Sequence, residues 1–152
     1  MNLHLLEPEV AGGLGENTSF TNQGEVEFLH YEFQGWLGDE LLESTPCFIV
    51  TESMANSIQI ANLSGAVFED IEYTATQEFS ELYPNRTLPN FKRLVVLGKV
   101  RVQSDAFYEW SGDDFCLTDE SYLVVTNNAF DILKVRQLNY CDTKKLSASE
   151  SY

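Results

Sequence analysis

The first 85 residues of this sequence contain no lysine and no arginine, and the first basic side chain is that of Arg86. The same stretch contains fifteen aspartates and glutamates, whereas residues 86–152 contain nine acidic and nine basic side chains, which cancel. The whole net charge of −15 therefore belongs to the N-terminal 85 residues. A surface of this sign repels phosphate, so we expect neither nucleic acid nor an anionic membrane as a partner.

Cysteine and histidine are also scarce. The three cysteines, Cys47, Cys116 and Cys141, are odd in number and show no CxxC spacing, and the only histidines are His4 and His30. This pattern disfavours both a disulfide framework and a zinc site. We therefore expect buried, reduced thiols, no bound metal and no cofactor.

No apolar run approaches the roughly 18 residues that a membrane-spanning helix requires. Residues 1–9 contain no basic segment followed by an apolar stretch of the kind that starts a secretion signal. These two absences predict a cytoplasmic protein.

The composition is that of a chain that folds. Hydrophobic residues make up 43% of the sequence, and they include ten phenylalanines, seven tyrosines and two tryptophans. A chain of 152 residues can bury a core without disulfides or metals. We expect one acidic α+β domain over residues 1–143, followed by a flexible serine-rich tail over residues 144–152.

Local patterns predict the elements of this domain. A glycine-rich loop covers residues 12–24, and Asp39 is positioned to cap a short helical turn through Leu42. Apolar or alternating segments predict strands at residues 3–6, 26–33 and 67–73, and residues 93–102 are predicted as a strand pair or as one long strand interrupted at Gly98.

One combination of strand, threonine cap and helix occurs twice. Residues 47–50 form a buried type of strand before Thr51, and a helix is predicted through Asn62; residues 123–125 precede Thr126 and a second helix. The two segments align without gaps at a spacing of 75, but a chance recurrence of a common motif would look the same. Together these elements predict an α+β fold with a mixed or mainly antiparallel sheet, on which a few short helices pack.

Sequence signatures of catalysis are weak. No GxSxG motif is present, and the glycines at 12–15 have no nearby cation that would make them a phosphate loop. Two acidic clusters keep other chemistry open: His30 with Asp39, Glu40 and Glu43 as a divalent-ion site, and a group around Trp110 for a small hydrolase or a metal-dependent enzyme. The second group consists of Asp105, Asp113 and Asp114.

The threonine-capped units resemble bacterial immunity proteins of polymorphic toxin systems. Residues 48–52 (Phe-Ile-Val-Thr-Glu), the helix after them and residues 62–70 (Asn-Leu-Ser-Gly-Ala-Val-Phe-Glu-Asp) are similar to a recurrent pattern of that family, which has serine at the cap. Residues 112–115 and 123–126 resemble its second such element. The resemblance covers about half of the chain and none of the region before Ser44. It implies a cytoplasmic protein that is not an enzyme and that binds a cognate toxin and blocks its active surface.

The sequence thus predicts an inhibitor that covers the basic cleft of a toxin domain by charge complementarity. The aromatic residues Tyr31, Trp36 and Tyr73 would anchor the interface if exposed. An adaptor role in a larger assembly, and a charge that only maintains solubility, remain alternatives, and the oligomeric state is open. The expected partner-binding residues are Glu25, Glu27, Glu32, Asp39, Glu40, Glu43, Glu69, Asp70 and Glu72.

Overall fold

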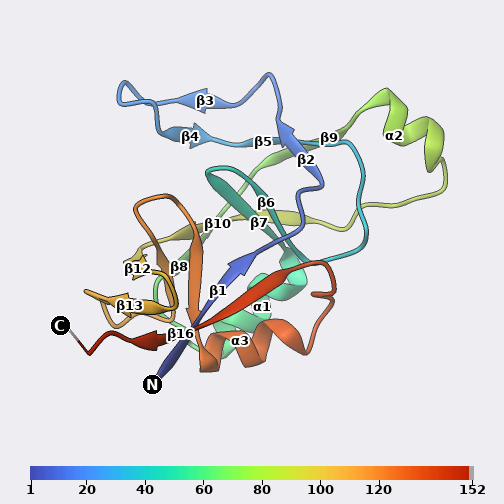
Figure 1. Ribbon diagram of the computed structural model, residues 1–152. Helices are drawn as coiled ribbons and strands as arrows, with labels where there is room; N and C mark the ends of the chain where they lie inside the picture. The colour runs from blue at the N-terminus through green and yellow to red at the C-terminus, as the bar shows by residue number, and fades with distance from the viewer. Residues whose placement is uncertain (151–152) are drawn as a thin grey trace.

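The computed structural model describes residues 1–150 and has the predicted α+β fold, with short strands in mixed sheets and few helices (Figure 1). The helices of these residues are α1 (Glu52–Ile60), α2 (Gln77–Leu82) and α3 (Asn127–Lys134). None of them is long and apolar enough to cross a membrane.

Two groups of four strands have the same arrangement: a hairpin whose second strand leads into a helix, then a strand from elsewhere in the chain, then the strand that follows the helix. The first group is a separate sheet of β6 (Leu41–Ser44), β7 (Cys47–Thr51), β10 (Phe91–Val96) and β8 (Ala66–Glu69), in that order. The second has the order β14 (Phe115–Leu117), β15 (Leu123–Thr126), β1 (Asn2–Glu7) and β16 (Asp142–Ala148). The second group lies within a sheet that also contains β11 (Gly98–Lys99), β12 (Arg101–Gln103) and β13 (Ala106–Tyr108).

The strand register follows the 75-residue spacing. Leu94 of β10 lies opposite Phe48, and Leu6 of β1 lies opposite Leu123, which is 75 positions after Phe48. In each unit the hairpin and helix are contiguous in sequence, whereas the strand that completes the sheet, β10 or β1, comes from elsewhere in the chain. The spacing is therefore that of a structural repeat whose two units are interlocked.

The two units share one hydrophobic core. Phe48 and Val50 of β7 point into it together with Leu123 and Val125 of β15. The helices add matching residues at the same spacing: Met54 with Ala129, and Ile58 with Leu133. Helices α1 and α3 lie side by side below the strands in Figure 1. The alternating residues of β7 and β15 point to the opposite faces of their sheets, where separate clusters cover them.

Each helix of the repeat begins at its threonine. The hydroxyl of Thr51 accepts a hydrogen bond from the backbone N–H of Met54 at 3.1 Å, and that of Thr126 accepts one from Ala129 at 3.3 Å. Both helices begin where the caps predict, and α1 ends two residues before Asn62.

A separate group of strands lies beyond the first sheet, at the top of Figure 1. We call it the acidic lobe; it contains no lysine or arginine. Its inner face packs Tyr31 and Phe33 against Ile49 and Phe91. Its strands are β2 (Gly12–Leu14), β3 (Ser19–Phe20), β4 (Val26–Phe28), β5 (His30–Phe33) and β9 (Glu72–Ala75).

Several predicted boundaries are wrong. Residues 26–33 form two strands, β4 and β5, and residues 67–73 divide between β8 and β9, which belong to different sheets. Residues 93–102 fall into three strands, which are interrupted at Leu97 and Val100, whereas the predicted interruption, Gly98, begins strand β11. The residues after Asp39 form strand β6 and no helical turn, because they pair with β7.

Two expected flexible segments are ordered by pairing. Residues 12–14 form strand β2 against β5. The predicted tail begins inside β16, which pairs with β1 from Asp142 to Ser147, so the expectation of flexibility is wrong for residues 144–148. The last residues of that predicted tail, 151–152, lie outside the described residues. Among the cysteines, Cys47 and Cys116 are buried free thiols as predicted, and Cys141 is only half-buried.

Candidate functional site

Three of the nine predicted contact residues form ion pairs with cations from the second half of the chain, namely Asp70, Glu69 and Glu40. Asp70 forms an ion pair with Lys92 at 2.7 Å, and this contact lowers the pKa of the Asp70 carboxyl. Glu69 lies 3.7 Å from the guanidinium of Arg93 on the adjacent strand. These two carboxylates are exposed, but their charge is locally compensated.

Glu40 serves the repeat and not an open surface. Its carboxylate accepts hydrogen bonds from Arg136 Nη2 at 2.9 Å, from the Thr51 hydroxyl at 2.7 Å and from the backbone N–H of Gln137 at 3.1 Å. Burial raises the pKa of Glu40, but these hydrogen bonds and the positive charge of Arg136 outweigh it, so the pKa is lower than usual. Glu40 is thus a structural anion.

Asp39 is fully buried, so its assignment as a contact residue is wrong. Its carboxylate accepts hydrogen bonds from the backbone N–H groups of Asn139 at 2.8 Å and Tyr140 at 2.7 Å. Its carbonyl accepts one from the indole of Trp36 at 2.9 Å. Asp39 therefore fixes the chain as it returns from α3 towards β16.

The remaining predicted residues, apart from Glu43, gather on the acidic lobe. Glu25 and Glu27 are exposed at the β3–β4 hairpin, and Glu32 and Glu72 lie half-buried on the outward face of the neighbouring sheet. None of the four forms an ion pair within residues 1–150. Glu43 is half-buried and accepts a hydrogen bond from the Thr45 hydroxyl, and burial raises the pKa of its carboxyl.

His30 lies within this lobe, and its ring forms no hydrogen bond with Asp39, Glu40 or Glu43, the acidic residues with which it was predicted to bind a divalent ion. Its Nε2 lies 2.7 Å from the Thr74 hydroxyl, and its Nδ1 accepts a hydrogen bond from the backbone of Asn17 at 3.2 Å. A Cβ at position 15 would overlap the His30 ring, and a Cβ at position 12 would overlap the carbonyl of Glu32. The lack of a side chain at these two glycines therefore allows the backbone of residues 12–15 to pack closely against β5.

The exposed aromatic residues of the lobe are different from those that were predicted as anchors. Tyr31 is fully buried, so it does not meet the condition of exposure, and Tyr73 is half-buried with its ring edge-on to Phe91 at 5.9 Å. The exposed aromatic residues of the lobe are Phe20, at 53% exposure, and Phe28, at 41%, both on the β3–β4 hairpin. Alternation indicates which side of a strand a residue occupies but not which side is covered, so the sequence pattern did not identify them.

The carboxylates around Trp110 have structural partners. Asp114 accepts hydrogen bonds from the Thr126 hydroxyl at 2.6 Å and from the backbone N–H of Ser64 at 2.9 Å. Asp113 accepts one from Ser111 at 2.7 Å, and Asp105 pairs with Lys144 at 3.2 Å. Each carboxylate binds a different group, and within residues 1–150 no three metal-ligating side chains are grouped to hold an ion.

Asp114 has the same role in the second unit that Glu40 has in the first. The segment Trp36-Leu37-Gly38-Asp39-Glu40 corresponds to Trp110-Ser111-Gly112-Asp113-Asp114. Both indoles donate to the carbonyl two residues before the next strand, and both glycines have a positive φ, +112° and +93°. This W-x-G-D-acid motif is readable in the sequence, and its 74-residue spacing would have identified both carboxylates as parts of the repeat.

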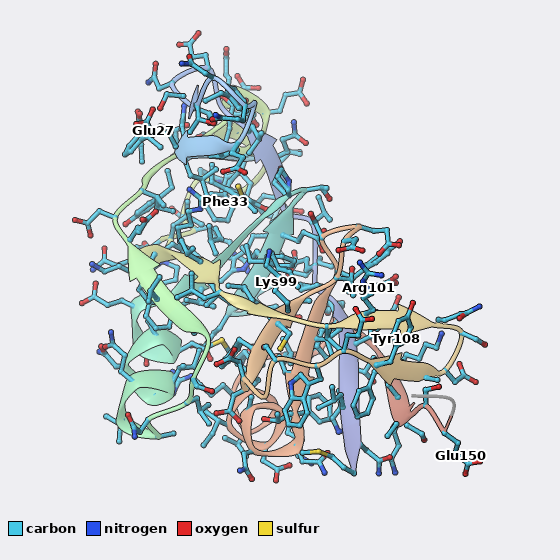
Figure 2. The ribbon with its side chains drawn as sticks, turned by 90° about the vertical axis from the view of Figure 1, so that its left-hand side faces the viewer. Glu27, Phe33, Lys99, Arg101, Tyr108 and Glu150 are labelled. Carbon is cyan, nitrogen blue, oxygen red and sulfur yellow. The ribbon has the colours of Figure 1, made fainter. Side chains whose placement is uncertain are left out.

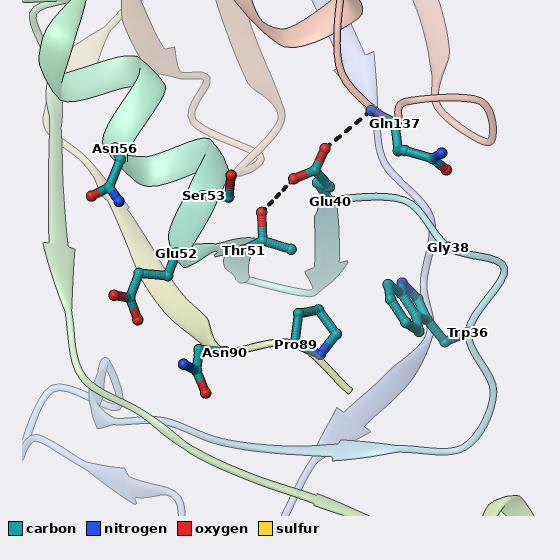
Figure 3. Close-up of a pocket in the computed structure, with 10 residues that line it drawn as sticks. All are labelled: Trp36, Gly38, Glu40, Thr51, Glu52, Ser53, Asn56, Pro89, Asn90 and Gln137. Carbon is teal, nitrogen blue, oxygen red and sulfur yellow. Dashed lines mark hydrogen bonds between the residues drawn. The ribbon is translucent and has the colours of Figure 1, made fainter. Parts of the chain in front are cut away.

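A pocket of about 690 Å³ opens between α1 and the connection that precedes β6 (Figure 3). Trp36 and Pro89 form its apolar side, and Glu40 and Thr51 lie at its inner end. Glu52 lies at its rim with the amides of Asn56 and Asn90.

Local contacts hold the walls of this pocket. The Trp36 ring meets Phe91 edge-on at 6.0 Å, and the Arg86 guanidinium lies 4.7 Å above the Trp36 ring. Glu9 lies under the same loop, 8% exposed, and accepts a hydrogen bond from the backbone of Leu37 at 2.7 Å. Its other oxygen has no partner, and burial raises its pKa.

Comparison with protein-family models and with curated proteins finds no match for this sequence.

Proposed function

We propose that this chain is an immunity-type protein that binds a cognate basic protein, such as a bacterial toxin domain, through its acidic lobe. The observation that carries the proposal is the set of four carboxylates on the lobe, Glu25, Glu27, Glu32 and Glu72, which have no basic partner within residues 1–150. Figure 2 places Glu27 at one end of the molecule, away from the labelled cations Lys99 and Arg101.

The lobe combines long-range attraction with contact energy. Uncompensated carboxylates steer a basic partner towards the surface and raise the rate of association. Phe20 and Phe28 then supply apolar area in the middle of the charged hairpin, and aromatic side chains in such places carry much of the binding energy of interfaces. The resemblance of residues 48–70 to immunity proteins supports a cytoplasmic protein that blocks a toxin.

The geometry of the other carboxylates supports binding over catalysis. Asp114 links Thr126 to Ser64 across the two units, and Asp113 accepts a hydrogen bond from Ser111, so both carboxylates have structural partners. Glu40 and Asp39 have corresponding structural roles in the first unit. Among the carboxylates that form no ion pair within residues 1–150, Glu25 and Glu27 are exposed on the lobe, where a partner can reach them.

The test uses the cognate toxin domain, which we expect to be encoded beside this gene. We expect the double variant Glu25→Lys with Glu27→Lys to bind it at least about tenfold more weakly by calorimetry, because two attractions become repulsions. Glu150→Lys is the control: it is a single reversal of the same residue type at the opposite end of the molecule in Figure 2, and should leave the affinity nearly unchanged.

Salt gives an independent readout. Added salt should weaken wild-type binding steeply, since exposed charges are screened over about 8–10 Å near physiological ionic strength. An affinity that ignores both the salt concentration and the double reversal would overturn the proposal.

A further inference from the structure

We infer that the pocket between α1 and Trp36 is a binding site for an arginine side chain presented by the basic protein partner. This inference rests on the proposed function and adds a specific anchor to it. The pocket is separate from the lobe surface, and it offers the two features that a guanidinium group requires, an apolar wall and an unpaired carboxylate.

The apolar wall consists of Trp36 and Pro89, which face the same space in Figure 3. An arginine combines an aliphatic stem with a planar cation, and it stacks on aromatic rings. The molecule already contains this interaction, since the guanidinium of Arg86 lies over the Trp36 ring. The pocket volume of about 690 Å³ leaves room for a side chain and the adjoining backbone.

The charge of the pocket favours a cation. Its lining includes Glu40 and Glu52 and no lysine or arginine. Arg136 satisfies Glu40, and Lys92, whose pKa is raised mainly by its contact with Asp70 and less by Glu52, is held by Asp70 at 2.7 Å. Glu52 forms no ion pair within residues 1–150. It is therefore the carboxylate available to a ligand.

The start of helix α1 does not make the pocket an anion site. The backbone N–H of Glu52 donates to the carbonyl of Asn90 at 2.8 Å, and that of Met54 donates to the Thr51 hydroxyl. The carboxylate of Glu52 occupies the first turn, where an anion would otherwise bind. Phosphate and carboxylate ligands would meet the unpaired negative charge of Glu52 here, so a cation is the better fit.

The equivalent place in the second unit lacks this chemistry. Glu52 corresponds to Asn127, which bonds to His4, and Ala55 corresponds to Phe130, on which His4 stacks at 4.5 Å. The same backbone thus carries a carboxylate beside an open pocket in one unit and a filled aromatic contact in the other.

The test uses the peptide Gly-Gly-Arg-Gly-Gly as probe, with the citrulline peptide as its neutral isostere. We expect the arginine peptide to shift the NMR signal of the Trp36 indole N–H, with a dissociation constant on the order of millimolar. The variant Trp110→Phe removes the only other indole N–H signal and so assigns the remaining one to Trp36. The citrulline peptide should produce no comparable shift, because it offers the same shape without the charge.

Two variants test the pocket itself. Glu52→Gln should weaken the arginine peptide about fivefold or more, because a charge-assisted hydrogen bond is lost. Glu78→Gln is the matched control: Glu78 is also exposed in the first turn of a threonine-capped helix, α2, and it should change nothing. Asn56→Arg should fill the pocket with its own guanidinium and block the peptide.

Three results would overturn the inference: no shift of Trp36, an equal shift with citrulline, or equal affinities for Glu52→Gln and Glu78→Gln. The proposed function fails separately, through toxin binding that ignores the lobe reversals. If the protein binds toxin through its lobe but does not bind the arginine peptide, the proposed function stands and the inference about the pocket is wrong.

Discussion

Glu40 and Asp114 show how single residues decide this fold. Each carboxylate accepts a threonine hydroxyl from its own unit and a backbone N–H from the loop after the other unit's helix. These acids were predicted as candidate binding or catalytic residues, because acidic side chains in a polar segment look the same whether they face solvent or a buried amide. Their true role depends on Gln137 and Ser64, which are distant in sequence.

Glu40→Gln should destabilise the protein by about 2 kcal/mol at neutral pH, because it leaves the half-buried Arg136 without its anion. The lowered pKa of Glu40 means that this stability is present above the ordinary carboxyl value of 4.5 and is lost as the pH falls through the folded value. Urea unfolding should therefore show a difference between variant and wild type that shrinks in acid.

The exposed pair of Glu109 with Arg101, at 3.3 Å, provides the comparison. Glu109→Gln should change the free energy of unfolding by less than about 1 kcal/mol, as exposed ion pairs usually do. Equal costs for Glu40→Gln and Glu109→Gln would show that Arg136 does not depend on Glu40.

Among the elements, the helices of the repeat were predictable and the strand ends were not. A threonine cap and a helical period are local signals, and they predicted the starts of α1 and α3 correctly. The split of residues 67–73 depends on partners, since β8 pairs with β10 and β9 pairs with β5. Helix α2 was missed because its 6 residues are too few to show a helical period in the sequence.

Thr51→Ala and Thr126→Ala should each lower the free energy of unfolding by about 1–2 kcal/mol, through the lost cap. Each threonine also donates to a carboxylate, so the loss should lie at the upper end of that range. Thr76 caps α2 through the N–H of Phe79 and donates to no carboxylate within residues 1–150, so Thr76→Ala should cost less.

Chemical denaturation measures all three variants. Serine keeps the hydroxyl, so Thr51→Ser should restore most of the stability lost in Thr51→Ala. A serine variant as unstable as the alanine variant would indicate that the methyl group, and not the cap, carries the effect.

At the scale of the whole molecule, the two units cannot be separated. Strand β1 completes the sheet of the second unit, and β10 completes that of the first, while both units contribute to one core. The acidic lobe packs on the outer face of the first sheet and leaves its charges on the far side. The lobe is therefore attached to the interlocked body through a buried apolar cluster.

Leu6 and Leu94 occupy matching buried places in this shared core. Leu6→Ala and Leu94→Ala should each cost about 2–5 kcal/mol, and each should lower the midpoint of a single transition. Circular dichroism and tryptophan fluorescence should give coincident curves for both variants. Two separate transitions, with one unit surviving the loss of the other, would contradict the shared core.

The sequence by itself determined the fold class, the threonine-capped helices, the 75-residue spacing and the concentration of negative charge, because these follow from composition and local periodicity. Only the tertiary structure decided which carboxylates are free. Pairing of β10 with β8 brings Arg93 to Glu69, and the return of the chain after α3 brings Arg136 to Glu40. Such neutralisation depends on contacts between residues distant in sequence. The repeated W-x-G-D-acid motif could have identified Glu40 and Asp114 as structural, but the pairing of Glu69 and Asp70 followed only from the sheet.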